Sequence, residues 1–189
     1  MNKKIFGISG YMGAGKSFAG LYFKSLGAYF IDADEVVDGL YAKGEPAYLK
    51  IVNYFGDRFL RKDGSINRAK IAKFVFDDAN KVRILNDLIH PFVMREIESR
   101  VNLAEVSVVF IEATYFLPRQ LGSIVEKILW IDCEKAILIK RAEHFGNKLF
   151  PKILNFQEKP LKIDAIVENN DGKARFESDL KKVWDKWVL

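Results

Sequence analysis

A glycine-rich stretch near the N-terminus constrains the fold of this chain more than any other feature. It fits the pattern G-x-x-x-x-G-K-[ST] at every fixed position, which Gly10, Gly15, Lys16 and Ser17 occupy. Glycines let the backbone turn tightly with its N–H groups inward, the lysine reaches the β- and γ-phosphates, and the serine hydroxyl ligates Mg²⁺. The pattern therefore predicts a site for a nucleoside triphosphate with Mg²⁺. The expected nucleotide contacts are the loop residues Gly10, Gly13, Ala14, Gly15, Lys16, Ser17 and Phe18.

The sequence on either side of this loop supports the same interpretation. Residues 3–9 form a short apolar run that we expect to be a buried strand, and residues 18–26 are expected to form a helix. A phosphate loop requires this order of strand, glycine loop and helix, and the helix N-terminus adds its positive dipole end to the anion site. The alternative is a glycine-rich turn that binds nothing, and this setting disfavours it.

The remaining apolar runs predict an α/β fold of the P-loop NTPase type. Strands are expected at 27–31, 106–111, 127–131 and 164–167. Because helical segments separate them, we expect a five-stranded parallel sheet with right-handed crossovers, flanked by helices. These helices are expected at 118–122, 134–144 and 148–157, followed by a C-terminal helix. An apolar stripe predicts that this last helix packs in the core through Leu180, Val183, Trp184, Trp187 and Val188.

A long helical stretch interrupts this alternation. About 70 residues without a convincing strand are too many for one crossover connection, so we expect an inserted helical subdomain. Its boundaries are placed at 35–104, the nucleotide-binding core at 1–34 and 105–189, and a lid at about 142–160. Within the insert, helices are expected at 35–42, 46–55, 67–77, 79–89 and 91–104.

Composition and charge narrow the classes of partner. The chain carries 30 Lys and Arg against 25 Asp and Glu, a formal net charge of +5 that suits phosphorylated ligands. Basic residues never run longer than pairs, so we expect a solvated surface and no nucleic-acid partner. No apolar run approaches a membrane span or a signal peptide, which predicts a cytoplasmic protein with no membrane partner. Cys133 is the single cysteine, which leaves no internal disulfide, and we expect a monomer or a weak homo-oligomer.

Acidic residues at strand ends favour phosphoryl transfer over nucleotide hydrolysis. Asp32 and Asp34 follow the strand at 27–31, Glu112 follows the strand at 106–111, and open α/β sheets place their ligands at such ends. Transfer to a hydroxyl needs a carboxylate near the acceptor, and no Asn-Lys-x-Asp guanine motif is present. We therefore assign Asp34 as the base or acceptor-orienting group, and Asp32 and Glu112 to the metal or its waters.

Each of these acids has an alternative role. We expect Asp32 and Asp34 to project to one side of an extended segment, but Asp34 could also cap a helix that begins at Glu35. Glu112 could be a solvated acid at the end of a strand. The basic residues of the lid, Lys140, Arg141, Lys148 and Lys152, either close over the phosphates or are surface charges.

At this level of detail the chain resembles the dephospho-coenzyme A kinase family. The resemblance is carried by motifs spread over most of the sequence, densely as far as Pro91 and thinly beyond it. They are Gly7-Ile-Ser-Gly10, Gly13-Ala-Gly-Lys-Ser17, Leu26-Gly27, Ile31-Asp-Ala-Asp34, Phe55-Gly56, Asp63-Gly-Ser-Ile-Asn-Arg68, Val75-Phe76, Arg83, Leu85-Asn86, His90-Pro91, Ile111-Glu112, Arg141 and Glu168-Asn169.

The resemblance implies a reaction and a division of labour. Enzymes of this family phosphorylate the ribose 3′-hydroxyl of dephospho-CoA with ATP in the last step of CoA biosynthesis. It implies that the helical insert binds the CoA substrate, that a lid covers the phosphates, and that Asn169 belongs to the nucleotide site. It also makes Asp34 the proposed base and Arg141 the residue that stabilises transferred charge.

Some positions depart from the family pattern. Phe18 stands where the family commonly has threonine, so a hydroxyl beside the phosphates is lost while the backbone N–H remains. The acidic residue usual a few positions after the third strand is missing from residues 114–118. The lid pattern keeps Arg141 but has Lys148 and Lys152 in place of later arginines, and lysine supplies charge without bidentate geometry. Arg119 is a candidate to compensate for the missing arginines.

Three residues of the insert, Arg68, Arg83 and His90, are candidates for substrate contact. The arginines could equally lie on helix surfaces, and His90 could pack at a helix junction before Pro91. Three other functions remain open: a kinase of another nucleoside or nucleotide, a weakly active ATP-binding regulatory protein, and a nucleic-acid binder that rests on the net charge alone.

Overall fold

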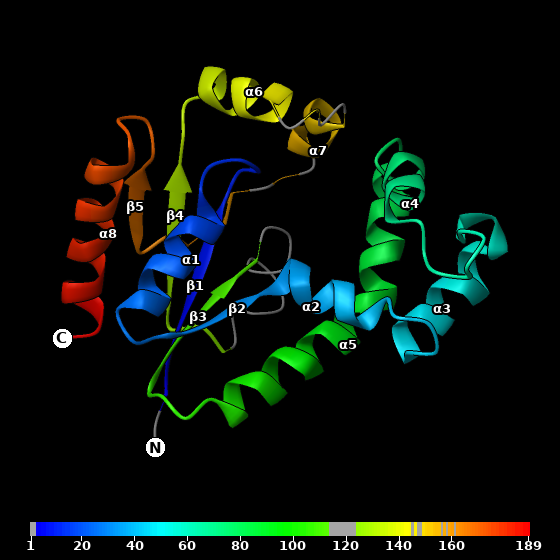
Figure 1. Ribbon diagram of the computed structural model, residues 1–189, viewed down its shortest axis with the longest axis horizontal. Coiled ribbons are helices and arrows are strands. Elements are labelled where there is room, and N and C mark those ends of the chain that lie inside the picture. Colours follow the sequence, from blue (N-terminus) through cyan, green and yellow to red (C-terminus); the bar gives the residue numbers. More distant parts are fainter. Residues whose placement is uncertain are drawn as a thin grey trace. The chain divides into compact units, whose positions relative to one another are not determined.

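The computed structural model describes residues 3–113, 124–144, 146, 149–155, 157, 159, 160 and 162–189. The helix expected at 118–122, Arg119 and Lys148 lie outside the described residues. The chain forms two compact units, which we call the sheet unit (Met1–Asp32 with Arg100–Leu189) and the helical unit (Ala33–Ser99) (Figure 1). The sequence placed these divisions at 34/35 and 104/105.

The sheet unit is built on five parallel strands, as the sequence predicted. They are β1 (Lys4–Gly10), β2 (Tyr29–Asp32), β3 (Val108–Glu112), β4 (Lys127–Asp132) and β5 (Ala165–Glu168), in the order β2-β3-β1-β4-β5. Because β1 lies at the centre and all strands point the same way, the loop after β1 and the residues that end β2, β3 and β5 reach one edge of the sheet (Figure 1). The predicted α/β fold class is confirmed.

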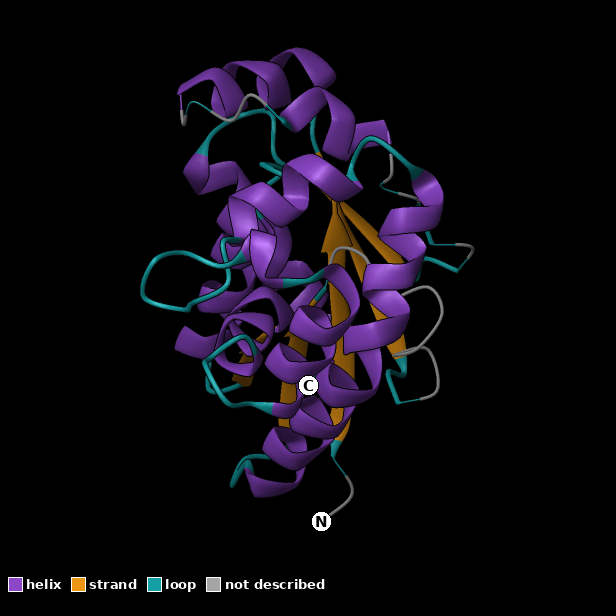
Figure 2. Ribbon diagram, turned by 90° about the vertical axis from the view of Figure 1, so that its right-hand side faces the viewer, coloured by secondary structure: helices purple, strands orange, loops and turns teal. Residues whose placement is uncertain are grey.

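Helices flank the sheet in the sheet unit and make up the helical unit, as the purple ribbons show (Figure 2). The sheet unit contains α1 (Lys16–Ser25), α6 (Lys135–His144), α7 (Phe150–Asn155) and α8 (Lys173–Trp187). The helical unit contains α2 (Ala33–Leu40), α3 (Pro46–Phe55), the 3₁₀ turn η1 (Asp57–Phe59), α4 (Arg68–Val75) and most of α5 (Ala79–Leu103). Among the described residues, no helix combines the length and the apolar character needed to cross a bilayer.

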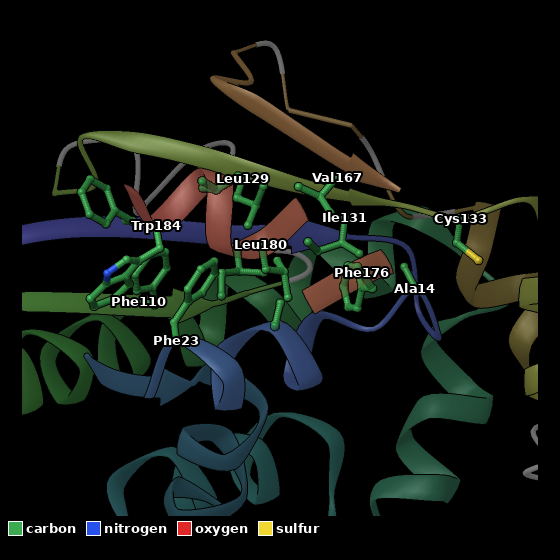
Figure 3. Close-up of a cluster of buried hydrophobic side chains, with 14 of the residues drawn as sticks. Ala14, Phe23, Phe110, Leu129, Ile131, Cys133, Val167, Phe176, Leu180 and Trp184 are labelled. Carbon is green, nitrogen blue, oxygen red and sulfur yellow. The ribbon is translucent and has the colours of Figure 1, made fainter. Parts of the chain in front are cut away.

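The core of the sheet unit lies between the strands and helices α1 and α8 (Figure 3). Phe23 of α1 stacks on Phe110 of β3 with ring centroids 4.0 Å apart, and Trp187 of α8 lies 5.2 Å from Phe6 of β1. Trp184 is also buried in this cluster. The expectation that the C-terminal tryptophans pack in the core is confirmed, and these large rings account for much of the apolar surface that holds α8 on the sheet.

Helix α5 corrects one expectation. The sequence placed separate helices at 79–89 and 91–104, because proline removes a backbone N–H and clashes with the preceding turn. The structure has one helix from Ala79 to Leu103 with Pro91 inside it. Buried apolar side chains on both sides of the proline, Ile89, Val93 and Ile97, are spaced for one helix face and hold the two halves together.

Helix α1 approaches β2 so closely that one helical position has no room for a side chain. A Cβ at Gly20 would lie 2.0 Å from a ring carbon of Phe30, although Gly20 sits inside a regular helix. Alanine normally favours a helix over glycine by about 1 kcal/mol, but here overpacking opposes that gain.

We expect Gly20→Ala to destabilise the protein by about 1–3 kcal/mol, because the Phe30 ring must move. Gly39→Ala in α2 is the matched control, since nothing lies within 4 Å of a Cβ there. Chemical denaturation of both variants would check this. A Gly20→Ala protein as stable as the wild type would contradict the close packing of α1 on β2.

Candidate functional site

The phosphate loop leaves β1 and enters α1 through backbone conformations that favour glycine. Gly10 and Gly15 have φ angles of 152° and 107°. A Cβ on Gly10 would lie 2.4 Å from the carbonyl oxygen of Ile131, and one on Gly15 would lie 2.4 Å from Nδ2 of Asn169. Side chains are therefore excluded at both positions. Helix α1 begins at Lys16, directly after Gly15, so its unsatisfied N–H groups and positive dipole end are available to an anion at the loop.

Three functional groups converge beside this helix start. Lys16 Nζ lies 3.9 Å from Glu112 Oε1, both side chains are 7% exposed, and Nζ also donates a hydrogen bond of 3.2 Å to the carbonyl oxygen of Tyr11. The Ser17 hydroxyl donates to the same Glu112 Oε1 at 3.2 Å. Buried charges are tolerated when they are paired, and this pairing holds the lysine beside the loop. The structure thus brings together a cation for phosphate oxygens with a hydroxyl and a carboxylate.

Asp32 lies beside Glu112 at the carboxyl edge of the sheet, because the parallel pairing of β2 with β3 puts the two residues in register. One hydroxyl and two carboxylates are oxygen donors of the kind that Mg²⁺ prefers, and Mg²⁺ usually keeps several waters. The described residues contain no group of three or more His, Cys, Asp or Glu side chains able to enclose a metal. Ser17, Asp32 and Glu112 supply oxygen donors of the type that suits such an ion.

Arg141 and Asn169 hold the outer side of the phosphate loop. Arg141 donates through Nη1 to the carbonyl oxygen of Gly13 at 2.8 Å and through Nη2 to that of Asn169 at 3.2 Å. Asn169 Nδ2 donates to the carbonyl oxygen of Ala14 at 2.7 Å. Arg141 also contacts Sγ of Cys133, a free thiol whose pKa is raised by burial. Both predicted site residues thus fix carbonyl groups of the loop, and Cys133 is a packed side chain.

A cavity of about 380 Å³ opens beside the loop within the sheet unit. The rings of Phe18 and Phe176 lie 5.6 Å apart, and Lys173 Nζ lies 5.6 Å from the centroid of Phe18. The sequence predicted a role for the backbone N–H of Phe18 but none for Lys173 or Phe176. The pattern of an amphipathic helix does not indicate which of its positions face a cavity. The lining residues are Gly13, Gly15, Phe18, Arg141, Asn169, Gly172, Lys173 and Phe176.

The structure corrects two expectations about Asp34. Helix α2 begins at Ala33, so Asp34 lies in its first turn, whereas Asp32 ends β2. The alternation of side chains along a strand therefore does not relate the two aspartates. Asp34 is also inside the helix and does not cap one that begins at Glu35. An acid in the first turn is favoured by the helix dipole, and this explains how the helix starts so soon after the strand.

In the helical unit, the motif Asp63-Gly-Ser-Ile-Asn-Arg68 forms a tight connection that ends at Arg68. Asp63 Oδ1 accepts hydrogen bonds from the backbone N–H and the hydroxyl of Ser65, at 2.9 Å and 2.7 Å. Asn67 then caps α4 by accepting a 3.0 Å bond from the N–H of Lys70. This geometry makes Arg68 the first residue of α4, where its side chain pairs with Asp38 of α2.

Comparison with known proteins decides the family. The family model described as dephospho-CoA kinase matches residues 4–171 of this chain. The chain belongs to the dephospho-CoA kinase family. A dephospho-CoA kinase of Aquifex aeolicus is 30% identical over 190 residues, which cover 97% of this chain and 97% of that protein. The resemblance drawn from the sequence motifs is confirmed.

Solved structures agree with the fold. A crystal structure of a Thermus thermophilus protein is similar with a TM-score of 0.79 and 19% identity, covering 100% of both chains. A dephospho-CoA kinase from Campylobacter jejuni gives a TM-score of 0.64 and 22% identity, covering 97% of this chain and 96% of its own.

The other candidates in this member of the dephospho-CoA kinase family lie in different surroundings. Arg83 is exposed on α5, and Lys152 is exposed on α7. His90 is 8% exposed, inside α5. Burial lowers the pKa of His90 from 6.5 to about 4, while the negative charge of Asp87 acts in the opposite direction. The burial favours the packing interpretation of His90 over substrate contact.

The shifted pKa of His90 predicts a loss of stability in mild acid. The unfolded chain takes up a proton near pH 6.5 and the folded chain only near pH 4, so the stability contributed by neutral His90 is complete above pH 6.5. It falls as the pH drops from 6.5 to 4, by up to about 3 kcal/mol. In denaturation curves, His90→Leu should flatten this part of the pH profile.

His144→Gln is the control for this experiment, because it changes the chain's other histidine, which is exposed. It should leave the loss of stability between pH 6.5 and 4 in place, because His90 stays buried. An unchanged slope in His90→Leu would contradict the burial of a neutral imidazole.

Proposed function

We propose that this chain transfers the γ-phosphoryl group of ATP to the ribose 3′-hydroxyl of dephospho-CoA, giving CoA and ADP. Family membership and a full-length relative support this reaction. The observation that carries it is the convergence of Lys16, Ser17 and Glu112 at the start of α1. In this proposal Lys16 binds phosphate while Ser17 and Glu112 hold the metal, the groups that a P-loop kinase needs at one point.

The sheet unit holds the donor. Backbone N–H groups of residues 13–18 and the ammonium of Lys16 bind the phosphates, and Lys16 shifts from Glu112 toward the γ-phosphate as negative charge arrives. Ser17, Glu112 and Asp32 would hold Mg²⁺, which would supply positive charge against the charge that develops on the phosphates. The base and ribose of ATP lie in the cavity bounded by Phe18, Arg141 and Asn169 and by the start of α8.

The helical unit supplies the group that acts on the acceptor. Asp34 accepts the proton of the 3′-hydroxyl, the freed oxygen attacks the γ-phosphorus, and the bond from this phosphorus to the β–γ bridging oxygen breaks, releasing ADP. Because one residue separates Asp34 from Asp32, chain connectivity keeps their Cα atoms within about 7 Å. Arg68 and Arg83 are the proposed contacts for the anionic part of the substrate.

Arg141 has two roles in this proposal. In the free protein its guanidinium fixes the loop carbonyl of Gly13. When ATP is bound, its positive charge beside the loop stabilises the transferred phosphoryl group, and residues 142–160 act as the lid. A cytoplasmic location, a monomeric or weakly oligomeric state and the lack of a nucleic-acid partner remain predictions.

The experiment that tests the function measures ADP release from Mg·ATP with dephospho-CoA, adenosine or nucleoside monophosphates, together with the product mass. We expect a mass gain of one phosphate with dephospho-CoA alone. Transfer to another nucleoside or nucleotide would assign the chain a different acceptor. ATP binding without transfer to any acceptor would overturn the kinase proposal in favour of a regulatory protein.

Asp34→Asn should reduce kcat by about 100-fold or more while ATP affinity is retained, because the amide cannot take up the hydroxyl proton. The control is Glu45→Gln, which removes an exposed negative charge before α3 in the same unit and should leave kcat unchanged. Steady-state kinetics and ATP titrations check both variants. Near-normal turnover in Asp34→Asn would refute Asp34 as the base.

A further inference from the structure

One face of α2 carries a polar cluster that the proposed reaction uses only in part. Asp34, Asp38 and Tyr41 follow one another at helical spacings of four and three residues, and the N–H of Tyr41 still bonds the carbonyl oxygen of Val37 at 3.1 Å. The side chains therefore share one face of the helix. Tyr41 directly follows the last residue of α2, and the charges of Asp38 and Asp34 both act on its hydroxyl.

Arg68 closes this cluster from α4. Its Nη1 pairs with Asp38 Oδ1, and its guanidinium carbon lies 5.6 Å from the centroid of the Tyr41 ring. The ion pair and the cation–π contact hold the tyrosine ring and the guanidinium against each other. The positive charge of Arg68 thereby offsets the negative charge of Asp38.

The hydroxyl of Tyr41 makes no hydrogen bond within the described part of the chain, although the residue is half-buried. Burial raises its pKa to about 12; the positive charge of Arg68 lowers this value, and the negative charges of Asp38 and Asp34 raise it. The hydroxyl therefore stays protonated at physiological pH and has a hydrogen to donate. This hydroxyl is close enough to Asp34, the proposed base, to feel its negative charge.

We propose that the Tyr41 hydroxyl binds the acceptor ribose by donating a hydrogen bond to its 2′-hydroxyl oxygen, while Asp34 acts on the 3′-hydroxyl next to it. The two groups are complementary, because a carboxylate accepts from one hydroxyl of a vicinal pair and a phenol donates to the other. Arg68 and Asp38 position the Tyr41 ring. This inference rests on the proposed function, since it takes the ribose of dephospho-CoA as the acceptor.

The test compares dephospho-CoA with its 2′-deoxy analogue, in the wild type and in Tyr41→Phe. With dephospho-CoA, Tyr41→Phe should raise KM for the acceptor about three- to tenfold, the loss of one hydrogen bond, and leave KM for ATP unchanged. In the wild type, KM for the 2′-deoxy analogue should exceed KM for dephospho-CoA by a similar factor. In Tyr41→Phe the two acceptors should have the same KM, because the mutation and the missing 2′-hydroxyl delete the same hydrogen bond.

Tyr54→Phe is the matched control, since the Tyr54 ring is 55% exposed and its hydroxyl has no assigned role. It should behave as the wild type with both acceptors, and thermal unfolding should show both variants folded. Two results would overturn the role of Tyr41 and leave the proposed function intact. Tyr41→Phe could raise KM by the same factor for dephospho-CoA and for the 2′-deoxy analogue, or it could leave KM for both unchanged. A wild type that phosphorylates neither acceptor would overturn both.

Discussion

The buried pair of Lys16 and Glu112 is the interaction on which the rest of the site depends. A lysine and a glutamate with 7% exposed side chains are tolerated because each neutralises the other. The pair joins the first residue of α1 to the last residue of β3, so it ties the phosphate loop to the strand beside β1. It also keeps both charges desolvated before any ligand arrives. Under the proposed function, phosphate meets a lysine that is already held in place by its pairing with Glu112.

Much of this arrangement follows from local sequence patterns. The phosphate loop can be predicted because each fixed position of its pattern needs a particular residue type. Gly10 and Gly15 have positive φ angles, which favour glycine. The five strands are short apolar runs, and the helical segments expected between them predict their number and parallel direction. Asp32 and Glu112 were assigned to the metal because both end strands, and their register in the sheet places them side by side.

Other features depend on contacts that no local pattern encodes. Pro91 suggested a break, but buried side chains on both sides of it keep α5 continuous. Asp34 was placed on an extended segment because the start of α2 at Ala33 depends on backbone geometry that propensities locate only to within a few residues. The sequence did not predict Tyr41 or Lys173 as site residues, because their contacts are with residues distant in sequence. Tyr41 contacts Arg68, and Lys173 contacts Phe18.

Helix α8 fills the core with Trp184 and Trp187 and lines the cavity beside the phosphate loop with Lys173 and Phe176. Ribosomal synthesis makes the phosphate loop long before it makes this wall of the cavity. A ligand that binds only the folded state stabilises it by mass action. A ligand that fills this cavity, which the proposed function takes to be ATP, therefore gains the contacts of α8 only once that helix has been made.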